Sequence, residues 1–295
     1  MRNFLYIFLI SVLFIDFAAV CQTSDNLDLL CKTKFSRERG VADVWGVKIN
    51  NTNYALVTLD GGLSIVDANN TMSPIETAHI NYIDYDIGDK LGVPDVETFT
   101  KDGVTYAYLA TNNGQFTGGI LVIIINLNQA IEDSGEILID PVNDTPNPNN
   151  VFAGKIDDSG EINLSHTLTI TGGYLYVSTF TNKIPVWNLN TNPTNPTYLG
   201  TATINTPNTG MHEMYVKSTG STTSKVYASG LRGGLHIIDF LDLPNNLSFE
   251  ETTQLYHSDK QYADQIISDD LDFDFRFTHS AWPNADGSYI FTTDE

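Results

Sequence analysis

The sequence contains few cysteines and few basic residues. Its 295 residues include two cysteines, 15 Lys plus Arg and 36 Asp plus Glu, which gives a net charge of −21 at pH 7. Two cysteines cannot build a disulfide framework, so we expect sheet packing to stabilise the fold and Cys31 to be a buried small apolar side chain. A surface this acidic repels the phosphates of nucleic acid, which excludes nucleic-acid binding.

The long apolar run at the start of the sequence covers residues 4–20 and follows a basic N-terminus. A basic start, an apolar core and small residues after it are typical of a secretory signal peptide. We predict a signal peptide at residues 1–21, cleaved after Cys21, and one domain at residues 22–295. The alternative is an uncleaved membrane anchor, because the run is close to spanning length. With cleavage no transmembrane segment remains, and the protein is expected to be secreted or on the cell surface.

Several short catalytic or phosphate-binding motifs are missing. There is no Gly-x-Ser-x-Gly nucleophile elbow, and the glycine-rich segments 114–119 and 231–234 lack the Lys-Ser/Thr pair of a phosphate-binding loop. We interpret both segments as tight turns. Arg232, in the second of them, is a candidate ligand-binding residue that meets an anionic ligand or pairs with a nearby carboxylate.

The acidic stretch at residues 258–275 raises the question of a calcium site. Calcium prefers oxygen ligands, but the spacing of these acidic residues does not match an EF-hand loop. A solvated acidic loop is the alternative interpretation. The aspartates concerned are Asp269, Asp270, Asp272 and Asp274.

A repeated hairpin pattern dominates the rest of the chain. Each copy opens on Asp or His, continues as a short apolar run, turns, and continues as a second run rich in aromatic and β-branched residues. In the last copy the runs THSAW and YIFTT flank the turn NADG, in which Asp-Gly favours a tight reversal. Openings recur roughly every 45–70 residues, which is the range of a four-stranded propeller blade. The five openings are Asp43, Asp95, His166, His212 and His279.

Further strands follow most of these hairpins. Third strands are predicted at residues 61–67, 118–126, 184–188 and 233–239, and fourth strands at 75–80, 197–204 and 249–256. Four short strands per repeat predict an all-β fold, a β-propeller of four-stranded blades with five blade starts, of which the last is incomplete. The alternative is a β-sandwich whose strands resemble one another by coincidence.

Three segments carry a resemblance to a known family. They are DVWG at residues 43–46, GGLSIVD at 61–67 and THSAWP to DGSYIFTTDE at 278–295. In combination they resemble the LVIVD-repeat β-propellers called choice-of-anchor B family proteins, over residues 43–295. The resemblance implies a secreted or cell-surface propeller, often held to the envelope by a separate C-terminal anchor. It implies no defined biochemical activity.

The resemblance also leads to an expectation about the C-terminal end of the sequence. Family members continue after the TTDE segment with further blades, so the sequence is expected to be partial, and the last sheet would lack its third and fourth strands. The alternative is that an N-terminal strand at residues 27–33 completes the last sheet.

The repeat openings are the strongest candidate for a site. The first strand of a propeller blade is innermost, so the five openings are expected to face one axis. Three hypotheses follow: a divalent-metal site held by the three histidines, a set of hydrogen bonds that latch one blade to the next, or a polar ring that contacts a ligand through Asp43 and Asp95. Because side chains alternate along a strand, Glu97 should share the face of Asp95, and Glu213 should point away from His212.

Two functions remain open at this stage. The first is a non-enzymatic propeller that binds a protein or carbohydrate ligand through its loop face. The second is a metal-dependent hydrolase or lyase that uses the His/Asp ring at the mouth of the channel, with at least three ligands around one ion. Insertions collect on the loop face, among them residues 82–94 and an irregular flap predicted at 141–160.

Overall fold

The computed structural model describes residues 40–82, 92–112, 119–157, 162, 164–204, 210–231, 234–241, 243, 247–255 and 278–294. Several predictions of the sequence fall outside these residues. They concern the signal peptide, Cys31, the strand at residues 27–33, Arg232 and the acidic stretch at 258–275.

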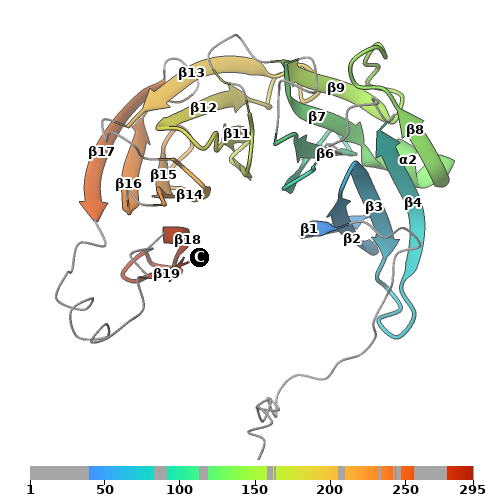
Figure 1. Ribbon diagram of the computed structural model, residues 1–295, viewed down its shortest axis with the longest axis horizontal. Coiled ribbons are helices and arrows are strands. Elements are labelled where there is room, and N and C mark those ends of the chain that lie inside the picture. Colours follow the sequence, from blue (N-terminus) through green and yellow to red (C-terminus); the bar gives the residue numbers. More distant parts are fainter. Residues whose placement is uncertain are drawn as a thin grey trace, which may run out of the picture. The chain divides into compact units, whose positions relative to one another are not determined.

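The described residues form five β-sheets whose strands run in chain order, and Figure 1 shows these sheets side by side in the same order. The first sheet begins with β1 (Val41–Ile49), β2 (Thr52–Leu59), β3 (Gly62–Asp67) and β4 (Ile75–Tyr82). The second contains β5 (Val96–Lys101), β6 (Val104–Ala110), β7 (Ile120–Asn126) and β9 (Phe152–Asp157).

The third and fourth sheets each contain four strands in the same order, and the fifth shows two strands among the described residues. The third contains β10 (Leu168–Thr171), β11 (Tyr174–Val177), β12 (Lys183–Asn188) and β13 (Thr197–Thr203). The fourth contains β14 (Glu213–Ser218), β15 (Ser224–Ser229), β16 (Leu235–Leu241) and β17 (Ser248–Leu255). The fifth shows β18 (Thr278–Pro283) and β19 (Ile290–Asp294). Repeated four-stranded antiparallel sheets confirm the predicted β-propeller.

Tight turns explain why the hairpins form where the sequence predicts them. In the β1–β2 turn Asn50 and Asn51 have φ angles of 48° and 67°, and in the β5–β6 turn Asp102 and Gly103 have φ angles of 52° and 82°. Positive φ at both central residues is the geometry of the two-residue turn that matches the twist of paired strands. Asn, Asp and Gly tolerate this geometry better than other residues do.

The second blade departs from the predicted flap. Residues 152–157 form β9, the fourth strand of the second sheet, so the prediction of an irregular segment across 141–160 is wrong for these residues. Phe152, Ala153 and Ile156 are buried. The sequence did not predict this strand, because it has only six residues and follows a segment rich in Asn and Pro.

An insertion between β7 and β9 ties the first two blades together. Helix α2 (Leu127–Asp133) is capped at its N-terminus by Asn126, whose side chain accepts a hydrogen bond from the backbone N–H of Gln129. Strand β8 (Gly135–Ile139) follows and pairs in parallel with β4 of the first sheet. Among the described residues, no helix is long and apolar enough to cross a membrane.

Apolar side chains fill the spaces between successive sheets. One cluster joins the first two blades, and it includes Leu56, Ile80 and Ile123. Equivalent clusters join the second blade to the third and the third to the fourth, with Tyr108 and Tyr176 among their fully buried members. The first strands of neighbouring blades also touch, because β1 contacts β5, β5 contacts β10, β10 contacts β14 and β14 contacts β18. This packing brings the repeat openings together.

Candidate functional site

All five repeat openings line one cavity of about 790 Å³. The cavity lies along the first strands of the blades and has a polar lining that combines carboxyl groups, imidazoles and aromatic rings. The openings that line it are Asp43, Asp95, His166, His212 and His279. Glu97 and Glu213 line it as well, so seven acidic or imidazole side chains border the same space.

The two aspartates form hydrogen bonds between blades. The Asp43 Oδ2 atom, on β1, accepts a hydrogen bond of 3.3 Å from the backbone N–H of Val96 in the second blade. The Asp95 Oδ2 atom accepts a hydrogen bond of 2.5 Å from the backbone N–H of Leu168 in the third blade. Each carboxyl group therefore satisfies a backbone donor of the next first strand, as the latch hypothesis predicted.

The junction between the third and fourth blades uses hydroxyl groups instead. The Thr167 Oγ1 atom donates to the carbonyl oxygen of His212 over 2.8 Å, and the Thr169 Oγ1 atom donates to that of Met214 over 2.7 Å. These two bonds join the starts of the third and fourth blades, and the His166 imidazole contacts other side chains. The five repeat openings therefore form two groups. The aspartate part contains Asp43 and Asp95, and the histidine part contains His166, His212 and His279.

The aspartate part is a cluster of carboxyl groups with altered acidity. Burial raises the pKa of Asp95 well above its usual range, and a hydrogen bond to the Asp43 carboxyl group raises it further. Burial also raises the pKa of Glu97 to about 8, assisted by the negative charge of Asp43. Glu97 lies on the face of Asp95, as strand alternation predicted. At neutral pH this part of the cavity therefore holds protons on carboxyl groups.

The histidine part begins with a chain of hydrogen bonds. The Asn112 Oδ1 atom lies 3.2 Å from His166 Nδ1, and His166 Nε2 lies 3.1 Å from His212 Nε2. The ring of Phe180 packs against His166, with ring centroids 4.1 Å apart. Burial lowers the pKa of His166 to about 4, and the neighbouring imidazoles of His212 and His279 lower it further. His166 is therefore neutral at physiological pH.

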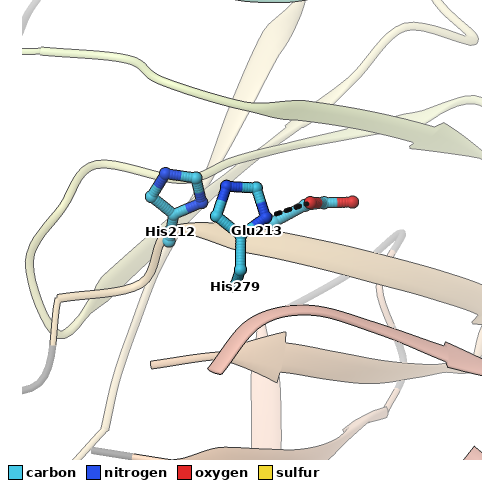
Figure 2. Close-up of side chains that lie close together, drawn as sticks. All are labelled: His212, Glu213 and His279. Atoms are coloured by element: carbon cyan, nitrogen blue, oxygen red, sulfur yellow. Dashed lines mark ion pairs between the residues drawn. The ribbon is translucent and has the colours of Figure 1, made fainter. Parts of the chain in front are cut away.

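Among the described residues, His212, Glu213 and His279 form a group of potential metal ligands. One ligand atom from each lies within 4.8 Å of the other two. Figure 2 shows the two imidazole rings next to each other, with the Glu213 carboxyl group beside the His279 ring. The His279 Nδ1 atom is 3.8 Å from Glu213 Oε2. The structure places His166 beside this group, in contact with His212.

The prediction that Glu213 points away from His212 is wrong. Strand β14 begins at Glu213, so His212 lies just before the strand, and the alternation of side chains does not extend to it. The Glu213 carboxyl group accepts a hydrogen bond from the Trp282 side chain on β18, which holds it toward the fifth blade. Burial raises the pKa of Glu213, and the His279 imidazole opposes this effect.

Shifts in strand register occur at two of the five repeat openings. The β18–β19 register shifts between Thr278 and Ser280, which leaves His279 as the extra residue of a bulge. The β1–β2 register shifts between Val41 and Val44, in the segment that contains Asp43. Bulges re-aim side chains and recur next to functional sites. Neither shift is visible in the spacing of the sequence.

Aromatic rings complete the lining. Trp282 is 51% exposed and packs on Tyr215, with ring centroids 5.0 Å apart. Trp45, on β1, also lines the cavity, and its indole Nε1–H donates to Thr98 Oγ1 over 3.0 Å. Sequence reasoning did not single out Trp45, Trp282 or Asn112 as site residues. Their only signal was their position within or next to the repeated hairpins.

No protein-family model and no curated protein matches the sequence. Among solved structures, BBS1N in complex with ARL6DN is similar at 10% identity and a TM-score of 0.50, over 90% of this chain and 65% of that one. A putative 6-phosphogluconolactonase from Bacteroides uniformis gives 12% identity and a TM-score of 0.49, over 84% and 62%. The Dos1 propeller gives 11% and 0.49, over 86% and 52%.

This chain therefore spans less than two thirds of the length of these similar structures. At such identities the likeness concerns the fold alone. The propeller fold itself follows from the repeated four-stranded sheets and the contacts between their first strands.

Proposed function

We propose that this protein is a binding module, a β-propeller that recognises a basic segment of a protein ligand in the cavity along its first strands. The observation that carries the proposal is a cavity of about 790 Å³ in which the exposed Trp282 ring lies beside the Glu213 carboxyl group. Cavities of this size that mix apolar surface with a few placed polar groups are the usual form of a ligand site.

The lining favours a cationic group. The Trp282 ring, 51% exposed, offers a π-face to a Lys or Arg side chain, and Glu213 lies directly beside it. The net charge of −21 attracts basic partners over longer distances and accelerates their association. BBS1N, whose fold this chain shares, was crystallised in complex with the protein ARL6DN, and that complex supports a protein ligand in preference to a carbohydrate.

A binding assay with synthetic peptides tests the proposal. The full chain should bind Lys/Arg-rich peptides and not acidic peptides of equal length, with an affinity that falls as salt rises. Trp282→Ala should weaken binding about fivefold, corresponding to a cation–π contribution of about 1 kcal/mol. Tyr289→Ala is the matched control, because Tyr289 lies on the same hairpin, is 70% exposed and does not line the cavity.

Three outcomes would count against this proposal. Equal binding of acidic and basic peptides would remove the electrostatic argument, and equal losses in the Trp282→Ala and Tyr289→Ala variants would move the site away from the cavity. Binding to an oligosaccharide array, but to no peptide, would point to the carbohydrate ligand instead.

We also propose a family and a cellular location for this protein. The segments GGLSIVD and THSAWP support assignment to the LVIVD-repeat propellers of the choice-of-anchor B family. The basic start and apolar run at residues 1–21 support export to the cell exterior. Expression with the native N-terminus, followed by N-terminal sequencing of the protein in the medium, should give a chain that starts at Gln22. An uncleaved chain retained in the membrane fraction would contradict export by signal cleavage.

One observation favours a second function, a metal-dependent hydrolase. His212, Glu213 and His279 supply two nitrogens and one carboxylate oxygen, which is the ligand set of several catalytic zinc sites. Zinc-loaded protein should then hydrolyse members of a panel of chromogenic esters and phosphate esters. Absence of turnover, or turnover that persists in a Glu213→Gln variant, would remove this function.

A further inference from the structure

We infer that His212, Glu213 and His279 bind one Zn²⁺ ion, and that Asn112 and His166 are positioning residues that present the correct nitrogen of His212 to it. This inference does not depend on the proposed peptide ligand, since it concerns the protein and the ion alone. Besides naming the ligands, it assigns the proton positions along a hydrogen-bonded chain of three side chains, Asn112, His166 and His212.

The separation of the ligand atoms suits a tetrahedral ion. Zinc–nitrogen bonds of about 2.0–2.1 Å place neighbouring ligand atoms of a tetrahedron about 3.4 Å apart. The three ligand atoms here lie within 4.8 Å of one another, and His279 Nδ1 is 3.8 Å from Glu213 Oε2. Small side-chain rotations close the remaining distance, and the partial exposure of His279 and Glu213 permits them.

The hydrogen-bond chain fixes the tautomer of His212. The Asn112 Oδ1 atom only accepts, so the His166 Nδ1 atom at 3.2 Å must carry the proton and donate it. In the neutral ring the His166 Nε2 atom is then an acceptor, and His212 Nε2, at 3.1 Å, must donate to it. The neutral His212 ring therefore carries its lone pair on Nδ1. Figure 2 shows a ring nitrogen of His212 on the side that faces His279.

This arrangement matches the way proteins prepare histidine ligands. A metal-binding imidazole commonly donates its other N–H group to a fixed acceptor, which sets both the tautomer and the ring orientation. Here the acceptor is His166 Nε2, and its own orientation is held by Asn112 and by ring contact with Phe180. His212 is buried, so its ring is held in place by its surroundings.

The other ligands are oriented from neighbouring elements. The Glu213 carboxyl group accepts a hydrogen bond from Trp282, and His279 protrudes from a β-bulge toward it. The charge of Asp43 also acts on Glu213, so a cation at this point gains from two carboxyl groups. Two imidazoles and one carboxylate favour zinc over calcium, which prefers oxygen ligands alone.

Metal titration of the full chain tests the inference. After treatment with chelator, isothermal titration with Zn²⁺ should show one ion per chain, and Co²⁺ should give the visible absorption of a tetrahedral site. Glu213→Gln and His279→Gln should each weaken Zn²⁺ binding by more than the about 10- to 100-fold typical of losing an outer hydrogen-bond partner. Glu97→Gln is the matched control, because it removes a cavity carboxyl group outside the triad and should leave affinity unchanged.

The thermal stability of each variant must be measured together with its affinity for Zn²⁺. Each variant should show a cooperative thermal unfolding transition, and Zn²⁺ should raise the Tm of the wild type and of Glu97→Gln but not of the double variant Glu213→Gln, His279→Gln. Zinc uptake that persists unchanged in a folded double variant would overturn the assignment. Failure of the wild-type chain to bind Zn²⁺ or Co²⁺ would overturn it as well.

A separate measurement tests the positioning residues. In metal-free protein, nitrogen NMR of the imidazoles should show His212 protonated at Nε2 and His166 at Nδ1. His166→Gln keeps an acceptor oxygen for His212 and should bind Zn²⁺ more tightly than His166→Ala, by at least about tenfold. Equal affinities of the two variants, or a His212 ring protonated at Nδ1, would contradict the proton chain even if the ion binds.

Discussion

Individual residues at the repeat openings perform different tasks although they occupy equivalent positions. Asp43 and Asp95 accept backbone hydrogen bonds from the next blade, while His166 and His212 bond to each other. A carboxyl group suits the first task because it keeps an acceptor oxygen for a backbone N–H group whether or not it carries a proton. The equivalent junction after His166 is held by the hydroxyl groups of Thr167 and Thr169. Equivalent position in a repeat therefore did not imply equivalent chemistry.

Replacing Asp95 tests the latch. Asp95→Ala removes the acceptor of the Leu168 N–H group, and we expect a loss of about 1–3 kcal/mol in the free energy of unfolding, because a buried donor loses its partner. Asp95→Asn keeps an acceptor oxygen and a donor toward Asp43, so its loss should be much smaller. Urea unfolding of both variants gives the comparison. Asp157→Ala, at an exposed position, is the control and should change stability by less than about 0.5 kcal/mol.

Glu97 should make stability depend on pH between about 4.5 and about 8. Its pKa is raised to about 8 in the folded protein and returns to about 4.5 in the unfolded chain. Between these values the folded state holds a proton that the unfolded state has lost, so stability falls as pH rises from about 4.5 to about 8. The slope attributable to Glu97 reaches about 1.4 kcal/mol per pH unit.

Unfolding measurements across this pH window check the assignment. Glu97→Gln mimics the protonated side chain, so the variant should lose this component of the pH dependence while retaining the wild-type stability near pH 5. An identical pH profile for wild type and variant would show that Glu97 keeps an ordinary pKa in the folded state.

At the scale of elements, short strands and bulges position the site. Strand β9 occupies only residues 152–157, yet it completes the second sheet and faces the third blade. The bulge at His279 turns an imidazole toward Glu213. Periodic patterns predict the regular part of a strand, and both features are departures from regularity.

Gly154, in β9, should not tolerate a side chain. A Cβ atom at this position would overlap the carbonyl oxygen of Thr194, which belongs to the loop between β12 and β13 of the next blade. We expect Gly154→Ala to destabilise the protein by about 1–3 kcal/mol, because the backbones of two blades must move apart. Gly46→Ala is the matched control, since Gly46 also lies in a strand and a Cβ atom there meets nothing within 4 Å.

Thermal unfolding of the two alanine variants gives the measurement. Gly46→Ala should be neutral or stabilising, because alanine reduces the conformational freedom of the unfolded chain. Equal Tm values for the two variants would show that the approach of β9 to the third blade is not close in solution.

For the whole molecule, charge is the dominant feature. The excess of 36 acidic over 15 basic residues produces self-repulsion that opposes the compact state. Raising NaCl to about 1 M shortens the Debye length to about 3 Å, so we expect the Tm of the full chain to rise. KCl should give the same shift, because screening does not depend on the monovalent ion. A Tm that falls with salt would show that attractive ion pairs outweigh the repulsion.

Much of the fold could be predicted from the sequence. The alternation of apolar residues, the Asx-Gly and Asn-Asn turns and the recurrence of the hairpins give strand identity and blade order, because these depend on interactions between residues close in the chain. The site could be predicted only as a set of positions. Asp43, Asp95, His166, His212 and His279 do line one cavity, since first strands of a propeller must face one another.

The remaining features were decided by tertiary structure. Glu213 lies beside His212 for two reasons. Strand β14 begins one residue later than the repeat suggests, and Trp282 of the fifth blade donates a hydrogen bond to the Glu213 carboxyl group. The proton chain through Asn112 and His166 joins side chains 54 and 46 residues apart. The sequence by itself determined which strands form and which residues open them, because local patterns specify both. Only the packing of blade against blade decided which of those residues bind the backbone and which face one another across the cavity.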